Sequence, residues 1–236
     1  MCSNNRQCIL FFTKWPQAGQ VKTRLSKDIG AERGTRLYAL FVEDLAQTLK
    51  RSDAQIICCF HPAEREEAFR RWLGSRFRYL PQEGQGLGER LEHAFVHAYS
   101  LGYDRVVVIG SDSPDLPTSL LDRALESLVR HDAVIGPSDD GGYYLIGFHV
   151  NTFCLSVFRH IEWSTEHVFE QTLRHLNETE ATLQVLPQWQ DVDTGRDLDR
   201  LVRRNTDTPF AASKTFGYCR NQGWDRPGRE ASSACR

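Results

Sequence analysis

Segments typical of strands and segments typical of helices alternate along most of this 236-residue chain. Short apolar, β-branched or aromatic runs predict seven strands, over residues 8–13, 55–60, 77–80, 105–109, 133–135, 143–148 and 182–186. Apolar residues at helical spacing predict six helices, over residues 32–50, 63–73, 88–101, 119–130, 166–177 and 196–204. This alternation predicts a three-layer α/β/α fold whose mostly parallel, Rossmann-like sheet is covered by helices on both faces. In such sheets ligands bind in the loops that follow the carboxyl ends of the strands.

Two places depart from the alternation. The strand-like runs at 133–135 and 143–148 are joined by "GPSDDGG", which is consistent with a hairpin or with a longer excursion. From about Pro209 small, polar and turn-forming residues dominate. We therefore expect a domain over residues 1–208 and an irregular tail over 209–236, with Phe216, Tyr218 and Trp224 as possible docking anchors.

Composition narrows the class of protein. Lys and Arg number 29 against 31 Asp and Glu, and the net charge of −2 gives no general attraction to nucleic acid or to a membrane. No apolar run approaches the ~18 residues of a membrane span, and the N-terminus lacks a signal-type apolar core, so we expect a cytoplasmic protein. The seven cysteines contain no C-x-x-C pair, which argues against a disulfide framework or a zinc site. The sequence gives no indication of the oligomeric state.

The stretch "KWPQAGQVKTRL", residues 14–25, follows the first predicted strand. Gly19 provides backbone freedom, while Lys22 and Arg24 place positive charge directly before a helix. Such a loop suits a phosphate, because backbone N–H groups and fixed charge meet at a helix N-terminus. Its spacing is neither the P-loop pattern nor the dinucleotide fingerprint, and a solvated basic loop is the alternative.

Acidic residues follow the predicted strand 105–109 in "VVVIGSDSPDLP". Asp112 and Asp115 lie just beyond its carboxyl end, and carboxylates there are suitable ligands for a hard cation such as Mg²⁺. For Asp115 the alternative is a helix cap. Asp112 follows the strand too closely to be a cap.

Two further stretches carry acidic residues next to glycine. In "PSDDGGYYLIGF", Asp139 and Asp140 precede Gly141 and Gly142, which predicts a tight turn that a ligand can approach closely; a plain Asp-Gly hairpin turn is the alternative. In "DVDTGRDL", residues 191–198, the spacing of a threonine and an aspartate three residues on predicts a capping box, which leaves the two preceding aspartates unexplained.

Taken together, these stretches resemble a known family. In order they are "FTKWPQAGQVKTRL", "PQEGQGLGERLEHAF", "GSDSPDLP", "GPSDDGGYYLIG", "EWSTEHVFEQT" and "DVDTGRDL", covering roughly residues 8–204. The chain resembles small bacterial nucleotide-diphospho-sugar transferases of the glycosyltransferase A fold, the radical-SAM/selenodomain-associated transferase 1 family, which is also linked to arsenosugar biosynthesis. The wider superfamily includes nucleotidyltransferases of molybdenum-cofactor and coenzyme F420 biosynthesis.

The resemblance implies a role for each matching residue. It implies phosphate or base contacts for the nucleotide-binding residues Lys14, Gly19, Lys22, Thr23, Arg24, Gln82, Gly86, Leu87 and Gly88. It implies metal binding by Asp112 and Asp193, and a sugar or acceptor pocket lined by Asp139, Asp140, Gly141 and Gly142. One departure is Gly86 in "QGLGE", where the family's Gly-Asp-Leu-Gly pattern has an acid.

The implied reaction is metal-dependent transfer of a sugar from a nucleotide-diphospho-sugar to a small-molecule acceptor. Mg²⁺ or Mn²⁺ held by the two aspartates, helped by Lys22 and Arg24, would neutralise charge that develops on the phosphate leaving group. Asp140 is the candidate general base, so the catalytic set is Asp140, Asp112 and Lys22. Two alternatives remain: a nucleotidyltransferase that couples a nucleoside triphosphate to a phosphorylated small molecule, and a nucleotide-binding or scaffolding protein without catalysis.

Overall fold

The computed structural model describes residues 6–225, which form two compact units. Among the described residues, the first unit contains 6–15, 48–110 and 116–190, and the second contains 16–47, 111–115 and 191–225. The chain therefore passes between the units several times, and each unit is described by itself below.

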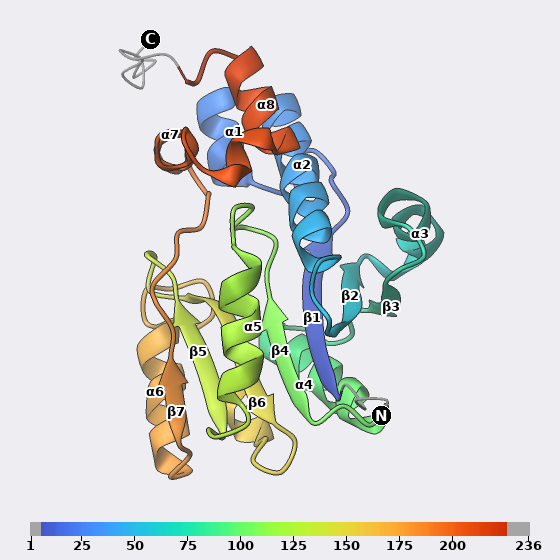
Figure 1. Ribbon diagram of the computed structural model, residues 1–236, viewed down its shortest axis with the longest axis vertical. Coiled ribbons are helices and arrows are strands. Elements are labelled where there is room, and N and C mark those ends of the chain that lie inside the picture. Colours follow the sequence, from blue (N-terminus) through green and yellow to red (C-terminus); the bar gives the residue numbers. More distant parts are fainter. Residues whose placement is uncertain (1–5, 226–236) are drawn as a thin grey trace. The chain divides into compact units, whose positions relative to one another are not determined.

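The first unit is built on a seven-stranded sheet in the order β3-β2-β1-β4-β6-β5-β7 (Figure 1). Its strands are β1 (Gln7–Lys14), β2 (Gln55–His61), β3 (Arg78–Pro81), β4 (Arg105–Ile109), β5 (Ala133–Pro137), β6 (Tyr143–His149) and β7 (Leu183–Val185). All neighbours pair in parallel except β6, which is antiparallel to both β4 and β5. The seven predicted strands and the mainly parallel α/β fold are confirmed, and β5 and β6 form the hairpin.

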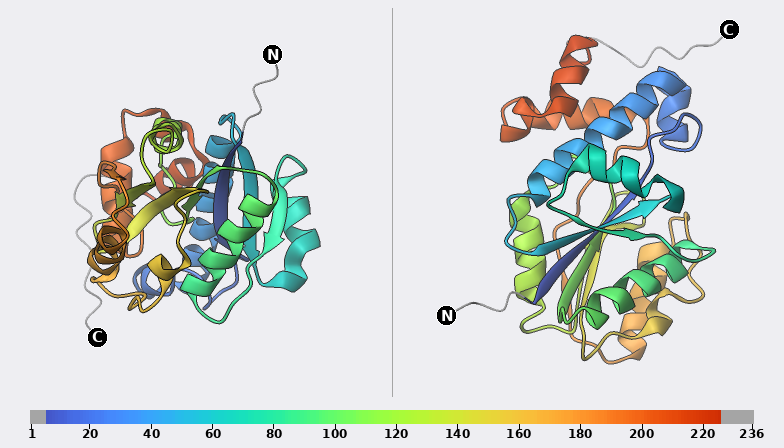
Figure 2. Two further views of the ribbon diagram at one scale, coloured as in Figure 1. Left: turned by 90° about the horizontal axis from the view of Figure 1, so that it is seen from below. Right: turned by 90° about the vertical axis from the view of Figure 1, so that its right-hand side faces the viewer.

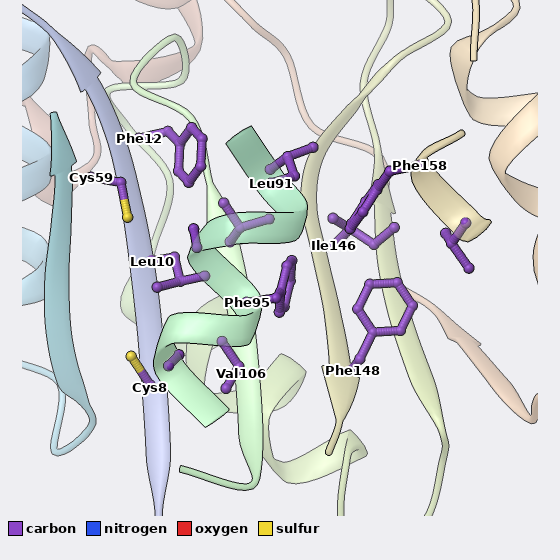
Figure 3. Packing of buried hydrophobic residues seen from close by; sticks show 14 of the residues in the cluster. Cys8, Leu10, Phe12, Cys59, Leu91, Phe95, Val106, Ile146, Phe148 and Phe158 are labelled. Carbon is purple, nitrogen blue, oxygen red and sulfur yellow. The ribbon is translucent and has the colours of Figure 1, made fainter. Parts of the chain in front are cut away.

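Helices cover both faces of this sheet. They are α3 (Glu66–Leu73), α4 (Leu87–Ser100), α5 (Thr118–Ser127) and α6 (Val168–Glu178), with short 3-10 turns at Ala63–Arg65 and Leu155–Phe158. The right-hand view of Figure 2 shows α5 on one face and α4 with α6 on the other. Figure 3 shows the packing beneath α4, where the Phe95 ring lies 5.4 Å from Phe148 and 5.8 Å from Phe158, centroid to centroid.

The five inner strands are apolar along nearly their whole length because both of their faces are covered, whereas the edge strands β3 and β7 are only partly buried. In β1 and β2 all but the terminal residues are buried, including Cys8, Cys58 and Cys59. The five cysteines in the described part of the chain are free thiols, as the absence of a disulfide pattern predicts. Within residues 6–225 there is no helix with the length and apolarity that a membrane span requires.

The second unit is helical. It contains α1 (Thr23–Ile29), α2 (Ala31–Leu49) as far as Gln47, α7 (Gly195–Asn205), a 3-10 turn at Pro209–Ala212 and α8 (Lys214–Asn221). Its apolar core joins all of these helices and is formed by Leu25, Leu37, Phe41, Val192, Leu198, Leu201, Val202, Phe216, Cys219 and Trp224.

The expected irregular tail is wrong for residues 209–225. The side chain of Ser213 accepts a hydrogen bond from Phe216 N and caps α8, and the Asp44 carboxylate accepts from Lys214 N and Thr215 N. The predicted anchors Phe216 and Trp224 are buried. Residues 226–236 of the expected tail lie outside the described part of the chain.

Candidate functional site

A buried lysine joins two aspartates in the second unit. The Lys22 ammonium forms a close ion pair with Asp112 Oδ1 and lies 2.9 Å from Asp193 Oδ1. The other oxygen of Asp193, Oδ2, accepts from Arg24 at 2.8 Å. The Lys22 side chain is 2% exposed, against 48% for Asp112 and 29% for Asp193. The structure thus brings together four of the predicted site residues, with the charged lysine inside and one carboxylate open to solvent.

The ion pairs favour the charged forms of Lys22 and Asp193. Burial by itself lowers the pKa of Lys22, but Asp112 and Asp193 raise it more, so the pKa lies above the ordinary lysine value. Burial likewise raises the pKa of Asp193, and Lys22 with Arg24 lowers it further than burial raises it. Lys22 and Asp193 are therefore both charged at neutral pH.

The backbone places Lys22 in an unusual conformation. Lys22 precedes α1 with φ 46° and ψ 46°, in the left-handed region that non-glycine residues seldom adopt. The loop before it includes a turn in which Gln20 N donates to Gln17 O, with Gly19 at φ 78°. Thr23 is the first residue of α1 and is exposed. The same residue thus combines a left-handed backbone with a buried ammonium that pairs with Asp112 and Asp193.

Asp112 lies in the segment 111–115, whose neighbouring polar side chains are fixed by hydrogen bonds. The hydroxyl of Ser111 lies 2.9 Å from Tyr38 Oη, and Ser113 Oγ donates to Asp191 Oδ1 in a short hydrogen bond. The Asp112 carbonyl accepts from Val192 N at 2.9 Å. The side chains on either side of Asp112 are thus held by Tyr38 and Asp191, and the Asp112 carboxylate pairs with Lys22.

Asp115 does not cap a helix. Its carboxylate accepts two hydrogen bonds from Arg204 and one from Asn205 at the end of α7. Pro117 is the residue before α5, which has no side-chain cap. The local spacing suggested a cap, but the partners lie 89 and 90 residues further along the chain, where sequence reasoning had no signal.

The segment that carries Asp193 is held by the predicted capping box. Thr194 Oγ1 accepts from Asp197 N, and Asp197 Oδ2 accepts from Thr194 N at 2.9 Å. A further hydrogen bond runs from Gly195 N to Asp28 Oδ2 at 2.8 Å, which ties the start of α7 to α1. Asp193 is thus fixed immediately before a capped helix.

The donor chemistry of the carboxylate pair fits a divalent cation. Mg²⁺ is commonly held by one or two carboxylates, with water and substrate phosphates completing its shell. Asp112 and Asp193 already converge on one cation, the Lys22 ammonium. Across residues 6–225 no group of three or more His, Cys, Asp or Glu residues is arranged to hold a metal, so ligands beyond this pair would have to come from water and substrate.

In the first unit, Gln82 and Gly88 have structural partners. Gln82 Nε2 donates to the carbonyls of Thr13 at 3.1 Å and Cys59 at 2.8 Å, which links β1 and β2 to the residue that follows β3. At Gly88 an added Cβ would lie 2.7 Å from Phe158 O, so the helix can only pack here with glycine. Contact of these residues with a base remains a prediction.

The neighbouring predicted residues are more accessible. Gly86 precedes α4 with extended backbone, and an added Cβ would meet no atom within 4 Å. Leu87 is 44% exposed, and Lys14 is exposed at the end of β1. A cavity of about 350 Å³ lies between the end of β3 and α4, lined by Leu80, Gln82, Arg90, His93, His97 and Ser100 among others.

The turn between β5 and β6 is organised by Asp140. Its Oδ1 accepts from Ser138 Oγ at 2.5 Å and from Gly142 N at 3.1 Å. Gly141 has φ 86°, and an added Cβ would lie 2.2 Å from Glu166 O. Asp139 Oδ2 accepts from Gln190 at 2.6 Å. The hairpin-turn interpretation therefore explains the glycines and one oxygen of Asp140, whereas a catalytic role for this exposed carboxylate stays a prediction.

Trp163 lies near two sets of predicted residues in the first unit, one at the start of α4 and one at the turn between β5 and β6. Its Nε1 would lie 3.1 Å from a Cβ added at Gly88, and its ring centroid is 6.4 Å from that of Tyr143, next to Gly142. Tyr143, which directly follows the turn at Asp139–Gly142, and the start of α4 therefore lie near the same aromatic side chain.

Solved structures share this architecture. A protein from Desulfovibrio desulfuricans G20, described as a candidate nucleotide-diphospho-sugar transferase, is 43% identical, with 94% of this chain and 97% of that chain covered and a TM-score of 0.91. Inositol-1-phosphate CTP transferase from T. maritima is 13% identical, with 88% and 97% covered and a TM-score of 0.54. The 4-diphosphocytidyl-2C-methyl-D-erythritol synthase from Anaerococcus prevotii DSM 20548 is 12% identical, with 81% and 95% covered and a TM-score of 0.52.

These likenesses define the class of fold as that of the nucleotidyltransferases and the glycosyltransferases of type A. Residues 44–165 match the family described as "Uncharacterized protein conserved in bacteria (DUF2064)". The chain belongs to this family. No match was found among curated proteins.

Proposed function

We propose that this protein is a transferase that moves a sugar from a nucleotide-diphospho-sugar to a small-molecule acceptor. The observation that carries the proposal is the cluster of Lys22, Arg24, Asp112 and Asp193, which combines phosphate-binding cations with cation-binding carboxylates. Support comes from the 43% identical protein, which is described as a candidate nucleotide-diphospho-sugar transferase.

The catalytic role of the cluster follows from charge. Glycosyl transfer from such a donor builds negative charge on the departing diphosphate. Lys22 and Arg24 would bind the phosphate oxygens and stabilise that charge, since both groups can donate charge-assisted hydrogen bonds. Mg²⁺ or Mn²⁺, held by Asp112 and Asp193, would supply further positive charge to the leaving group when bound.

On the acceptor side, Asp140 is the proposed general base. Its exposed carboxylate is oriented by Ser138 and Gly142, and a base of this kind would take the proton of an acceptor hydroxyl. Asp140→Asn keeps an oxygen that accepts from Gly142 N but cannot take up the proton. We expect this variant to keep nucleotide affinity and to lose about 100-fold or more in turnover; unchanged turnover would remove the assignment.

Nucleotidyl transfer is the alternative reaction. Here Lys22 and Arg24 would stabilise the charge on departing pyrophosphate rather than on a nucleoside diphosphate. The pairing of two cations within one helical turn, next to both aspartates, suits the more highly charged triphosphate. A protein that binds a nucleotide without transfer is the remaining possibility.

A product assay by mass spectrometry distinguishes the three functions. The protein is offered nucleotide sugars and nucleoside triphosphates with Mg²⁺ or Mn²⁺ and a metabolite extract, and Asp112→Ala serves as the control. A nucleoside diphosphate with a new glycosylated product supports the proposed reaction. Pyrophosphate with a nucleotidylated product supports the alternative, and binding without product would overturn both.

A further inference from the structure

We propose that Lys22 and a divalent cation compete for the same two carboxylates, so that the cation occupies them only when the Lys22 ammonium has moved away. The inference rests on the proposed transferase function in expecting a divalent cation at this pair. It adds an order of events that the proposed function does not require.

The position of the ammonium is the first argument. Lys22 Nζ contacts Oδ1 of Asp112 and lies 2.9 Å from Oδ1 of Asp193. A cation that bridged these same two oxygens would occupy the space of the ammonium group. Mg²⁺ approaches carboxylate oxygens to about 2.0–2.1 Å, so the two cations cannot share this position.

Charge balance is the second argument. The two carboxylates already face two cations, because Arg24 pairs with Asp193 through Oδ2. Adding a doubly charged ion beside both cations would leave a strong excess of positive charge. The Lys22 side chain is 2% exposed, so water screens the repulsion poorly there. Departure of Lys22 relieves both the overlap and the repulsion.

A phosphate provides the destination for Lys22. Lysine carries its charge on a flexible four-carbon stem, and here that stem starts from a strained left-handed residue behind an exposed loop at Gln17–Gln20. Leaving two carboxylates is less unfavourable when another anion receives the ammonium. Phosphate binding and cation binding at this cluster should therefore favour each other, and such coupling is reciprocal.

The test is Mn²⁺ binding measured by electron paramagnetic resonance without any nucleotide. Lys22→Met removes the competing ammonium and should raise Mn²⁺ affinity by about tenfold or more. Arg24→Met is the matched control, because it removes an equal charge from Asp193 without vacating the space between the carboxylates; its effect should stay near the roughly twofold change of an exposed pair. Equal effects of the two variants, or no gain in Lys22→Met, would overturn the proposal.

A double variant and a replacement variant secure the result. Adding Asp112→Asn to Lys22→Met should abolish the gained affinity; retained affinity would show binding elsewhere and overturn the proposal. Should Lys22→Met fail to fold, as judged by circular dichroism, Lys22→Gln replaces it, since its shorter polar side chain also removes the positive charge and is better tolerated beside carboxylates.

The unmodified protein offers an independent readout. Reductive methylation followed by peptide mass spectrometry compares buried Lys22 with exposed Lys27. Titration with Mn²⁺ should increase modification of Lys22 relative to Lys27, and a constant ratio would contradict the exchange. Neither measurement contains a nucleotide or acceptor, so a negative product assay would overturn the proposed function and leave this inference standing.

Discussion

The Arg204 guanidinium holds the buried Asp115 carboxylate through two hydrogen bonds, from Nε to Oδ2 at 2.8 Å and from NH2 to Oδ1 at 2.9 Å. The Asp115 side chain is 2% exposed, and Asn205 adds a third hydrogen bond at 2.7 Å. Because Asp115 ends the segment that carries Asp112, this contact fixes the segment to α7 within the second unit.

Arg204→Met should therefore destabilise the protein and disturb Asp112. Removing one partner of a buried ion pair leaves an incompletely compensated charge, which typically costs about 3 kcal/mol or more. Urea denaturation measures the change, and Arg203→Met is the control, because the neighbouring Arg203 is exposed and should change stability by less than about 0.5 kcal/mol. Similar values for the two variants would show that the pair contributes little.

The contact between Asp115 and Arg204 also shows which interactions the sequence alone does not predict. The capping box at Thr194 and Asp197 is predictable, because its two members lie one helical turn apart. The partners of Asp115 are set by tertiary structure, and nothing in the local sequence identifies them. The inner strands were also predictable from local sequence, because burial on both faces leaves a continuous apolar run.

The two helices that the predicted ranges do not contain, α1 and α8, are short. The seven residues of α1 and the eight of α8 give too little periodicity to stand out from a loop. Both are stabilised by tertiary contacts, Leu25 and Phe216 lying in one core. In the site, the sequence suggested a phosphate-binding role for Lys22 and a metal-binding role for Asp112. It did not suggest that the two side chains form an ion pair with each other.

Gly141→Ala should be far more disruptive than Gly19→Ala. Both glycines have positive φ, 86° and 78°, so alanine is strained at either position. At Gly141 the new Cβ would also lie 2.2 Å from Glu166 O, whereas at Gly19 it meets nothing within 4 Å. We expect a loss of about 1 kcal/mol at Gly19 and about 3 kcal/mol or more at Gly141, measured by urea denaturation. Equal losses would mean that the hairpin moves readily away from Glu166.

Asp132 should make stability depend on acid pH. Hydrogen bonds from the Thr182 hydroxyl and backbone N–H lower its pKa below the ordinary aspartate value. A lowered folded-state pKa means that the stabilisation is complete above the unfolded pKa of about 3.9 and is lost as pH falls through the folded value.

The measurement for Asp132 compares urea midpoints of wild type and Asp132→Asn. We expect wild type to be the more stable at pH 7, with the difference shrinking below about pH 4 as the Asp132 carboxylate takes up a proton. A difference that stays constant across this range would contradict the assignment to this carboxylate.

Phe216→Ala tests the corrected structure of the C-terminal part. Phe216 is 5% exposed and packs with Leu25, Leu37 and Phe41 in the core of the second unit. Emptying such a site removes buried apolar area and leaves a cavity, which typically costs about 3–5 kcal/mol. Val129→Ala is the control, since Val129 is 66% exposed and should change stability by less than about 0.5 kcal/mol. A loss below about 1 kcal/mol at Phe216, measured by urea denaturation, would return residues 209–225 to the loosely held tail that their composition first suggested.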